Sequence, residues 1–243
     1  MVQVVEGIAL EEVLLPAVCF TVCVVFQAWE FLGSHDDPAR ARSLFKSVRA
    51  GWIKDQYMKG TAACNTTRDY IKSAVFMANT AITLATFTVG YAASIYTDCS
   101  DDGNCTPEDW LFVVKLGILA AVLLTIFFVF TQCTRFAVHF SFCINTAEIE
   151  GVPVSHGLLV KVFEHSHQYF SLGIRLYFGT IPVFAWMFTP WALLAVTPAY
   201  IYMVRGLENA GFVEAEIEEV ERAKAALPGS SSGEQSAPTA STS

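Results

Sequence analysis

The length of its apolar runs limits how this chain can fold more than any other feature. Four blocks of mainly hydrophobic residues each come close to or exceed about 20 residues, the length of helix that crosses a hydrocarbon core of about 30 Å. They occupy residues 14–32, 71–96, 110–131 and 181–203. In lipid only helices and closed barrels satisfy the backbone amides, and these blocks are too long for barrel strands. The sequence therefore predicts an all-α integral membrane protein, a four-helix transmembrane bundle.

The composition agrees with a membrane domain over residues 1–205. Hydrophobic residues make up 53% of the chain and charged residues 16%, outside the usual range of soluble domains. Beyond that domain, residues 206–227 place glutamates around apolar residues at heptad-like steps, which predicts an acidic surface helix. Residues 228–243 are too polar to bury a core and are predicted to form a disordered tail.

The last apolar stretch can be divided in two ways. Polar residues recur at helical spacing over residues 157–179, which predicts an amphipathic helix at the cytoplasmic interface, leading into the fourth span. Alternatively, Tyr169 to Thr189 forms a span and Pro190 to Arg205 a short partner, as a re-entrant hairpin or a fifth crossing. An apolar run of about 35 residues is too long for one straight span and short for two.

Basic residues gather in one connection, between the first two spans. They are Arg40, Arg42, Lys46, Arg49, Lys54, Lys59 and Arg68, whereas the connection between spans two and three has no lysine or arginine. By the positive-inside rule, residues 33–70 are cytoplasmic and the N-terminus is not. Four spans would return the C-terminus to the N-terminal side.

Two of the seven cysteines, Cys99 and Cys105, flank a short polar turn in a loop predicted to face an oxidising space. This placement predicts a local disulfide. The others on hydrophobic helices are expected to stay free thiols. A calcium site built from Asp98, Asp101 and Asp102 in the same loop remains an alternative to a solvated turn.

One polar face of the second span predicts how it packs. Asn79, Thr83, Thr86 and Gly90 follow each other at steps of four, three and four, so they share one side of a helix. Small and hydroxylated residues allow membrane helices to approach closely and to hydrogen-bond, so we expect a helix-packing seam. A polar path through the bundle, centred on Asn79, remains an alternative.

An arginine and a histidine follow the third span on the same helix. About 20 residues counted from Trp110 reach the far side of the bilayer near Phe130. Arg135 is therefore expected at the cytoplasmic headgroup level and His139 one turn beyond it. Arg135 is either a snorkelling anchor or points into the bundle.

The sequence contains no HExxH, paired CxxC, P-loop or GxSxG motif. No catalytic residue can be assigned, so the question of enzymatic activity stays open. We expect no cofactor, no metal and no nucleic-acid partner. The five histidines are all placed on the cytoplasmic side and are expected to be solvated or satisfied rather than haem ligands.

Several motifs occur in an ordered series along the chain. They are "RAGWI" from Arg49, "NTTRDYI" from Asn65, "NTAITL" from Asn79, Lys115, "QCTRFAVHFSFCINT" from Gln132, and "GIRLYFGTIPVFAWMFTP" from Gly173. Over residues 8–205 the series resembles the multi-pass membrane family catalogued as domain of unknown function 599. The second motif departs from the family's usual Gln-Thr-Leu-Arg-Asn pattern but keeps Arg68. The resemblance implies a multi-pass membrane protein and no particular activity.

Family motif and fixed charge coincide at Arg68, Arg135 and Arg175, with His139 and Asn145 close by. Guanidinium groups that converge at one membrane face can bind an anionic lipid headgroup or a small anionic solute. The first hypothesis is therefore a ligand-binding membrane module, within a transporter or complex. Its expected partners are the lipid bilayer, anionic phospholipid, and other membrane proteins or a second copy.

Two other hypotheses remain. One is a structural or assembly subunit without a ligand, in which the arginines pair internally, with Asp69 and Glu164 as the expected partners. The other is a lipid-modifying membrane enzyme, which needs an acid-base or nucleophilic pair that the sequence does not identify.

Overall fold

The computed structural model describes residues 10–33, 41–57, 59, 61–102, 106–146, 148–149, 152–208, 219 and 222. Nearly all of them lie in helices: α2 (Leu10–Gly33), α3 (Ala41–Gln56), α4 (Thr61–Asp102), α5 (Pro107–Cys143), α6 (His156–Phe188) and α7 (Pro190–Glu208). A two-residue antiparallel ladder pairs β1 (Glu148–Ile149) with β2 (Val152–Pro153). The predicted all-α class is confirmed for this part of the chain.

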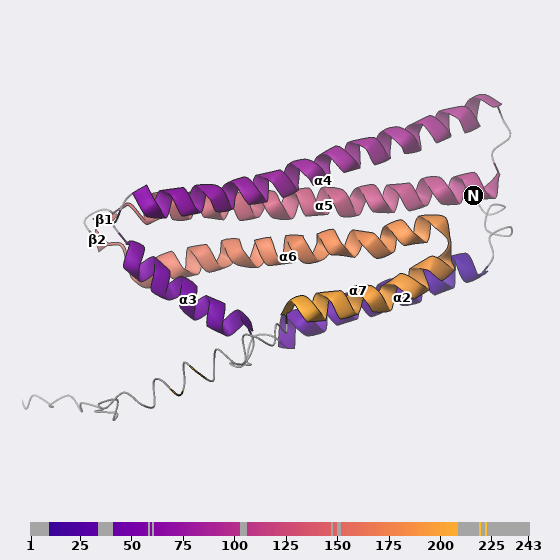
Figure 1. Cartoon of the computed structure of the whole chain (residues 1–243). Helices are drawn as coiled ribbons and strands as arrows, with labels where there is room; N and C mark the ends of the chain where they lie inside the picture. The colour runs from indigo at the N-terminus through magenta and orange to yellow at the C-terminus, as the bar shows by residue number, and fades with distance from the viewer. Residues whose placement is uncertain are drawn as a thin grey trace, which may run out of the picture.

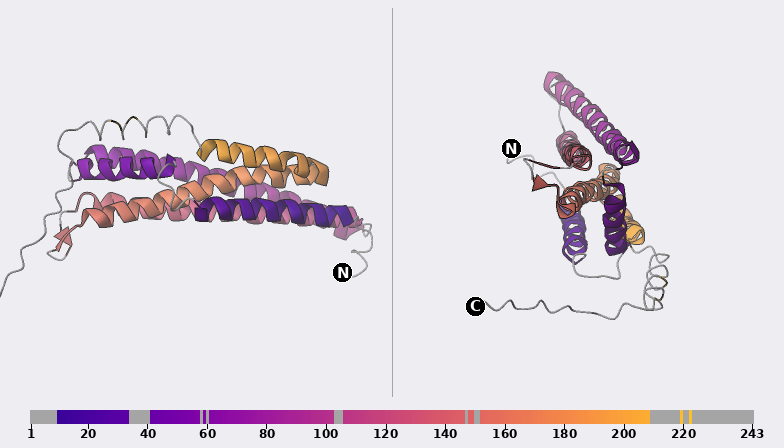
Figure 2. Two further views of the ribbon diagram at one scale, coloured as in Figure 1. Left: turned by 90° about the horizontal axis from the view of Figure 1, so that it is seen from below. Right: turned by 90° about the vertical axis from the view of Figure 1, so that its left-hand side faces the viewer.

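Three long helices, α4, α5 and α6, run side by side, and the shorter pair α2 and α7 covers part of α6 (Figure 1). Helix α5 packs between α4 and α6, and α7 packs between α6 and α2. Helix α3 lies against α6 near the end that carries the β1–β2 hairpin (Figure 2). The bundle therefore has one part built from five helices and a narrower part in which α3 joins α4, α5 and α6.

The long helices are the ones fit to cross a membrane. Helices α4, α5 and α6 are each long and apolar enough to do so, while α2 carries a shorter apolar segment, Leu14–Trp29. At about 1.5 Å per residue, the 37 residues of α5 extend about 55 Å, well beyond a hydrocarbon core of about 30 Å. The predicted spans 71–96 and 110–131 lie inside α4 and α5, which continue past them.

The helix boundaries in residues 156–208 differ from the preferred prediction. Residues 157–179 are not a separate amphipathic helix, because they form the first two thirds of the continuous helix α6. The predicted span 181–203 is divided at Thr189, which has an extended backbone (φ −167°, ψ 147°). The proline ring disfavours helical geometry at the preceding residue, and Pro190 then starts α7. The alternative division places the break at the same position, although α6 begins at His156 and not at Tyr169.

Helix α7 packs alongside α2 and runs parallel to it. Buried Leu193 clusters with Cys19, Tyr200 accepts a hydrogen bond from Gln27, and the Arg205 guanidinium lies 5.9 Å from the Phe26 ring centroid. Residue numbers rise together along both helices, so α7 ends at the same end of the bundle as α2. The C-terminus itself lies outside the described residues, so the expected side of the C-terminus stays a prediction.

The packing seam of α4 is a row of alanines. Ala74, Ala78, Ala81 and Ala85 are buried against α5 with Leu119, Leu123 and Ile126. Asn79, Thr83, Thr86 and Gly90, which we expected in a packing seam, are exposed on the opposite side of the helix. Alanine permits the same close approach as other small residues and leaves no polar group to satisfy, so the interior seam is apolar.

The predicted disulfide is supported at one end. Cys99 is disulfide-bonded, whereas Cys105 lies outside the described residues. Cys19, Cys23, Cys64, Cys133 and Cys143 are free. No group of acidic, histidine or cysteine side chains fit to hold a metal occurs among the residues with described placement. The acidic helix 206–227 and the tail 228–243 fall almost wholly outside those residues.

Candidate functional site

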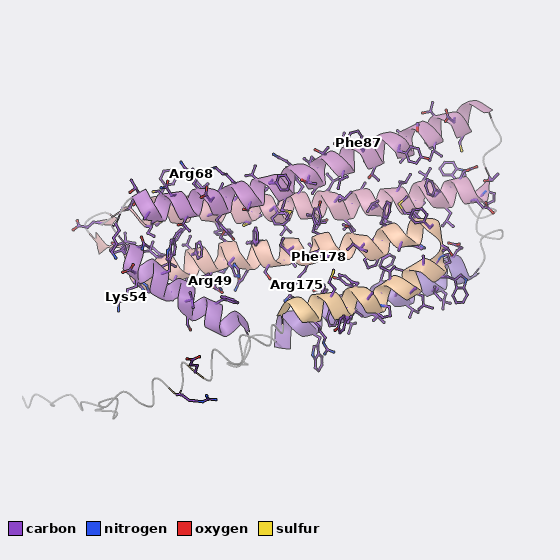
Figure 3. All side chains as sticks on the ribbon, viewed as in Figure 1. Arg49, Lys54, Arg68, Phe87, Arg175 and Phe178 are labelled. Atoms are coloured by element: carbon purple, nitrogen blue, oxygen red, sulfur yellow. The ribbon has the colours of Figure 1, made fainter. Side chains whose placement is uncertain are left out.

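The structure places Arg175 apart from Arg68, with which it was predicted to converge (Figure 3). Arg68 and Arg135 are exposed, whereas Arg175 is buried at 6% exposure. Phe136, next to Arg135, packs on His165 and stacks on Tyr169. Arg175 follows these contacts by six to ten residues of α6, about 9 to 15 Å further along the bundle at about 1.5 Å per residue. Figure 3 shows Arg68 on the outer side of α4 and Arg175 nearer α7.

His139 and Asn145, the other residues of the predicted cluster, are also exposed. The Asn145 side-chain amide donates to Cys64 Sγ at 3.0 Å and to the Ser141 carbonyl at 3.1 Å. These bonds tie the end of α5 to the beginning of α4. Asn145 therefore contributes to the fold at this end of the bundle.

The carboxylates expected to neutralise the arginines pair elsewhere. Asp69 accepts from Lys72 at 3.2 Å, and Glu164 accepts from Arg49. Arg135 donates to the Gln132 side chain at 3.5 Å and lies 5.9 Å from the Phe136 ring centroid. Within the described chain, neither Arg68 nor Arg135 forms an ion pair.

Exposed basic side chains form a surface at the end of the bundle that carries α3 and the β1–β2 hairpin. We call this surface the basic collar; its members are Lys46, Lys54, Arg68, Arg135 and Lys161. No carboxylate among the described residues lies within ion-pairing distance of them. The opposite end is acidic, with Asp98, Glu108 and Asp109.

The strongest charge pairing near the collar joins α3 to α6. Arg49 donates from one nitrogen to both oxygens of Glu164 at 3.2 Å, and both side chains are about four-fifths buried. One turn further along α3, Trp52 packs on Phe140 and Phe163. The ion pair and the aromatic contacts together orient α3 on the long helices.

We expect Arg49→Ala to destabilise the bundle by about 1 to 3 kcal/mol, because it leaves a mostly buried carboxylate without its cation. The matched control is Lys59→Ala, which breaks the 2.6 Å pair with Asp55 on the exposed side of α3, where solvent screens the charges. Unfolding by SDS in mixed micelles gives both values. Equal effects of the two substitutions would contradict the structural role of Arg49.

A buried polar cluster joins the three long helices. The Ser166 hydroxyl is fully buried and donates to the Cys133 carbonyl at 2.8 Å, and the Tyr70 hydroxyl lies 3.3 Å from Cys133 Sγ. Serine and cysteine are nucleophiles only when a base activates them. The bonded partners are another hydroxyl, a thiol and a carbonyl, and these bonds hold the three helices together.

A second buried cluster was missed by sequence reasoning as a site. Lys115 on α5 is 6% exposed, donates to Glu12 of α2 at 3.0 Å, and lies 5.3 Å from the Trp186 ring centroid of α6. The sequence signal for such a pair is a lysine inside one predicted span together with an acid near the start of another. Here these are Lys115, five residues into the span 110–131, and Glu12, just before the span 14–32. The three residues fix α2 to the bundle at the end opposite the collar.

A comparison with protein families finds a match over most of the chain. The model described as "Protein of unknown function, DUF599" matches residues 14–210. Among curated proteins and solved structures, no match is found.

Proposed function

Because the chain belongs to the DUF599 family of proteins of unknown function, no activity carries over to it, and we propose from its geometry that it binds anionic phospholipid headgroups. The binding surface is the basic collar, and the setting is an integral membrane protein. The observation that carries this proposal is that Arg68 and Arg135 are exposed and without a carboxylate partner in the described chain. Guanidinium groups bind phosphate through paired, charge-assisted hydrogen bonds.

The level of the collar suits this role. Helices α2 and α7 end partway along α5, while α4, α5 and α6 continue for several turns (Figure 1). We place the bilayer around the five-helix part, so that α2 and α7 complete five crossings. Arg135 then lies where α5 leaves the hydrocarbon, at the level of the lipid phosphates.

The sign of the charge favours the cytoplasmic leaflet. The positive-inside rule assigns the collar to the cytoplasmic side, and that leaflet carries the anionic lipids. The acidic opposite end would repel the same headgroups. The collar therefore has both the charge and the depth to retain anionic lipid.

Native mass spectrometry of the full chain, reconstituted with equal phosphatidylglycerol and phosphatidylcholine, tests the proposal. At about 1 kcal/mol for each basic residue near the surface, Arg68→Ala with Arg135→Ala is expected to lower phosphatidylglycerol retention about 30-fold. The control is Lys59→Ala, which removes a paired basic residue at the same end, and this variant is expected to retain the lipid. Unchanged retention in the double variant would contradict the proposal.

The second candidate is a structural or assembly subunit without a ligand. It is favoured by the two mostly buried ion pairs, Arg49 with Glu164 and Lys115 with Glu12, which satisfy charge inside the fold. In that case the double collar variant retains lipid as the parent chain does. The same mass-spectrometry experiment therefore separates the two functions.

A further inference from the structure

Helix α4 has one face that no described element covers. Its alanine row packs on α5, and Tyr70 reaches α6. The opposite face lies at the edge of the bundle, where Phe87 points outward (Figure 3). The exposed residues along that face follow steps of three and four: Phe76, Asn79, Thr83, Thr86 and Gly90.

Two polar side chains on this outer face differ from their neighbours in hydrogen bonding. Eight other hydroxyl groups of α4 bond to carbonyls three or four residues back along the helix: those of Thr66, Thr67, Ser73, Thr80, Thr86, Thr88, Ser94 and Thr97. Thr83 makes no such bond, and the Asn79 carboxamide has no hydrogen-bond partner within the described segments. An amide or hydroxyl exposed to hydrocarbon without a hydrogen-bond partner costs free energy, because no water is present to serve as that partner.

We propose that a second copy of this chain covers the outer face of α4. The two α4 helices then run in parallel about a twofold axis along the membrane normal. A carboxamide both donates and accepts, so Asn79 is complementary to Asn79 of the partner subunit. Each Asn79 amide thereby gains from the partner subunit the hydrogen bonds that its own bundle does not provide.

The shape and charge of the face also fit a copy of itself. Steps of three and four match the seam of a left-handed helix pair, and a polar residue in such a seam fixes its register. Gly90 has open space where a Cβ atom would lie, which lets the helix axes approach. Residues 73–97 contain no charged side chain, so no like charges meet across the axis.

Oxidative cross-linking of the full chain in reconstituted vesicles tests the geometry. Thr83→Cys is expected to form a covalent dimer well above the background of the parent chain. The matched control, Leu84→Cys, is also exposed but lies about 100° around the helix and is expected to cross-link several-fold less. Equal cross-linking at the two positions, or none at Thr83→Cys, would overturn the proposal.

Energy transfer between donor-labelled and acceptor-labelled copies in bilayers tests the role of the amide. Asn79→Ala is expected to weaken association about tenfold. Thr88→Ala, which removes a self-bonded hydroxyl from another side of α4, is expected to leave association unchanged. Absence of energy transfer at every protein density would refute self-association, and equal transfer in both variants would refute the role of the Asn79 amide in it. A Thr83→Cys cross-link found in native membranes only to a different polypeptide would assign the face to that protein instead.

Discussion

Replacing Glu12 with alanine is expected to destabilise the folded bundle by about 3 to 5 kcal/mol, the largest single effect in this protein. Lys115, its partner at 3.0 Å, is 6% exposed and sits in a mainly apolar helix. Without the carboxylate, the Lys115 ammonium keeps only its contact with the Trp186 ring, and a desolvated cation–π contact is worth about 2 kcal/mol. Removing one member of a buried pair costs more than removing both.

The free energy of unfolding in SDS mixed micelles measures this effect. The double variant Glu12→Ala with Lys115→Met is expected to recover most of the loss, since no buried charge remains unpaired. The control is Glu108→Ala, an exposed acid at the same end, for which we expect a change within about 0.5 kcal/mol. If Glu12→Ala were no more destabilising than Glu108→Ala, α2 would not be held by this pair.

The second large effect is expected at Gly173, where α6 packs on Phe130 of α5. A Cβ atom on Gly173 would lie 2.8 Å from the ring of Phe130, which is fully buried. Gly173→Ala therefore forces the ring or the helices apart. We expect a loss of about 1 to 3 kcal/mol in the free energy of unfolding, as in other overpacked cores.

Gly117→Ala on α5 is the matched control for this substitution. Nothing lies within 4 Å of the Cβ position at Gly117, so alanine is expected to be neutral or to stabilise the helix by up to about 1 kcal/mol. The same SDS titration compares the two variants. Loss of stability at Gly117 equal to that at Gly173 would show that contact with Phe130 does not decide the outcome.

Much of the fold can be predicted from the apolar runs alone. Their length gives the helical membrane class and locates the spans within α4 and α5, because backbone hydrogen bonding in lipid leaves few alternatives. The division of the last run was harder to predict. Pro182 and Pro198 lie inside helices, while only Pro190 of these three follows a break. Proline signals a possible break, and packing on the neighbouring helices decides where it occurs.

The candidate site was less predictable, because periodicity shows which residues share a face but not where that face points. On α4 the polar row and the alanine row have similar spacing, and only the tertiary structure shows that the alanines pack on α5. The arginine cluster depended in addition on the relative levels of three helices. The position of Arg175 along α6 follows from contacts such as Phe136 with Tyr169, which sequence spacing does not contain.

Helix α3 and the projecting ends of α4, α5 and α6 present the basic collar, which we propose to lie on the cytoplasmic side of the membrane. Accessibility of introduced cysteines to a membrane-impermeant maleimide in intact cells tests it, with the parent chain as the baseline. Glu108→Cys is expected to react at once, and Lys54→Cys and His139→Cys only after permeabilisation. Reaction of Lys54→Cys and His139→Cys from opposite sides, or of both together with Glu108→Cys, would contradict the account.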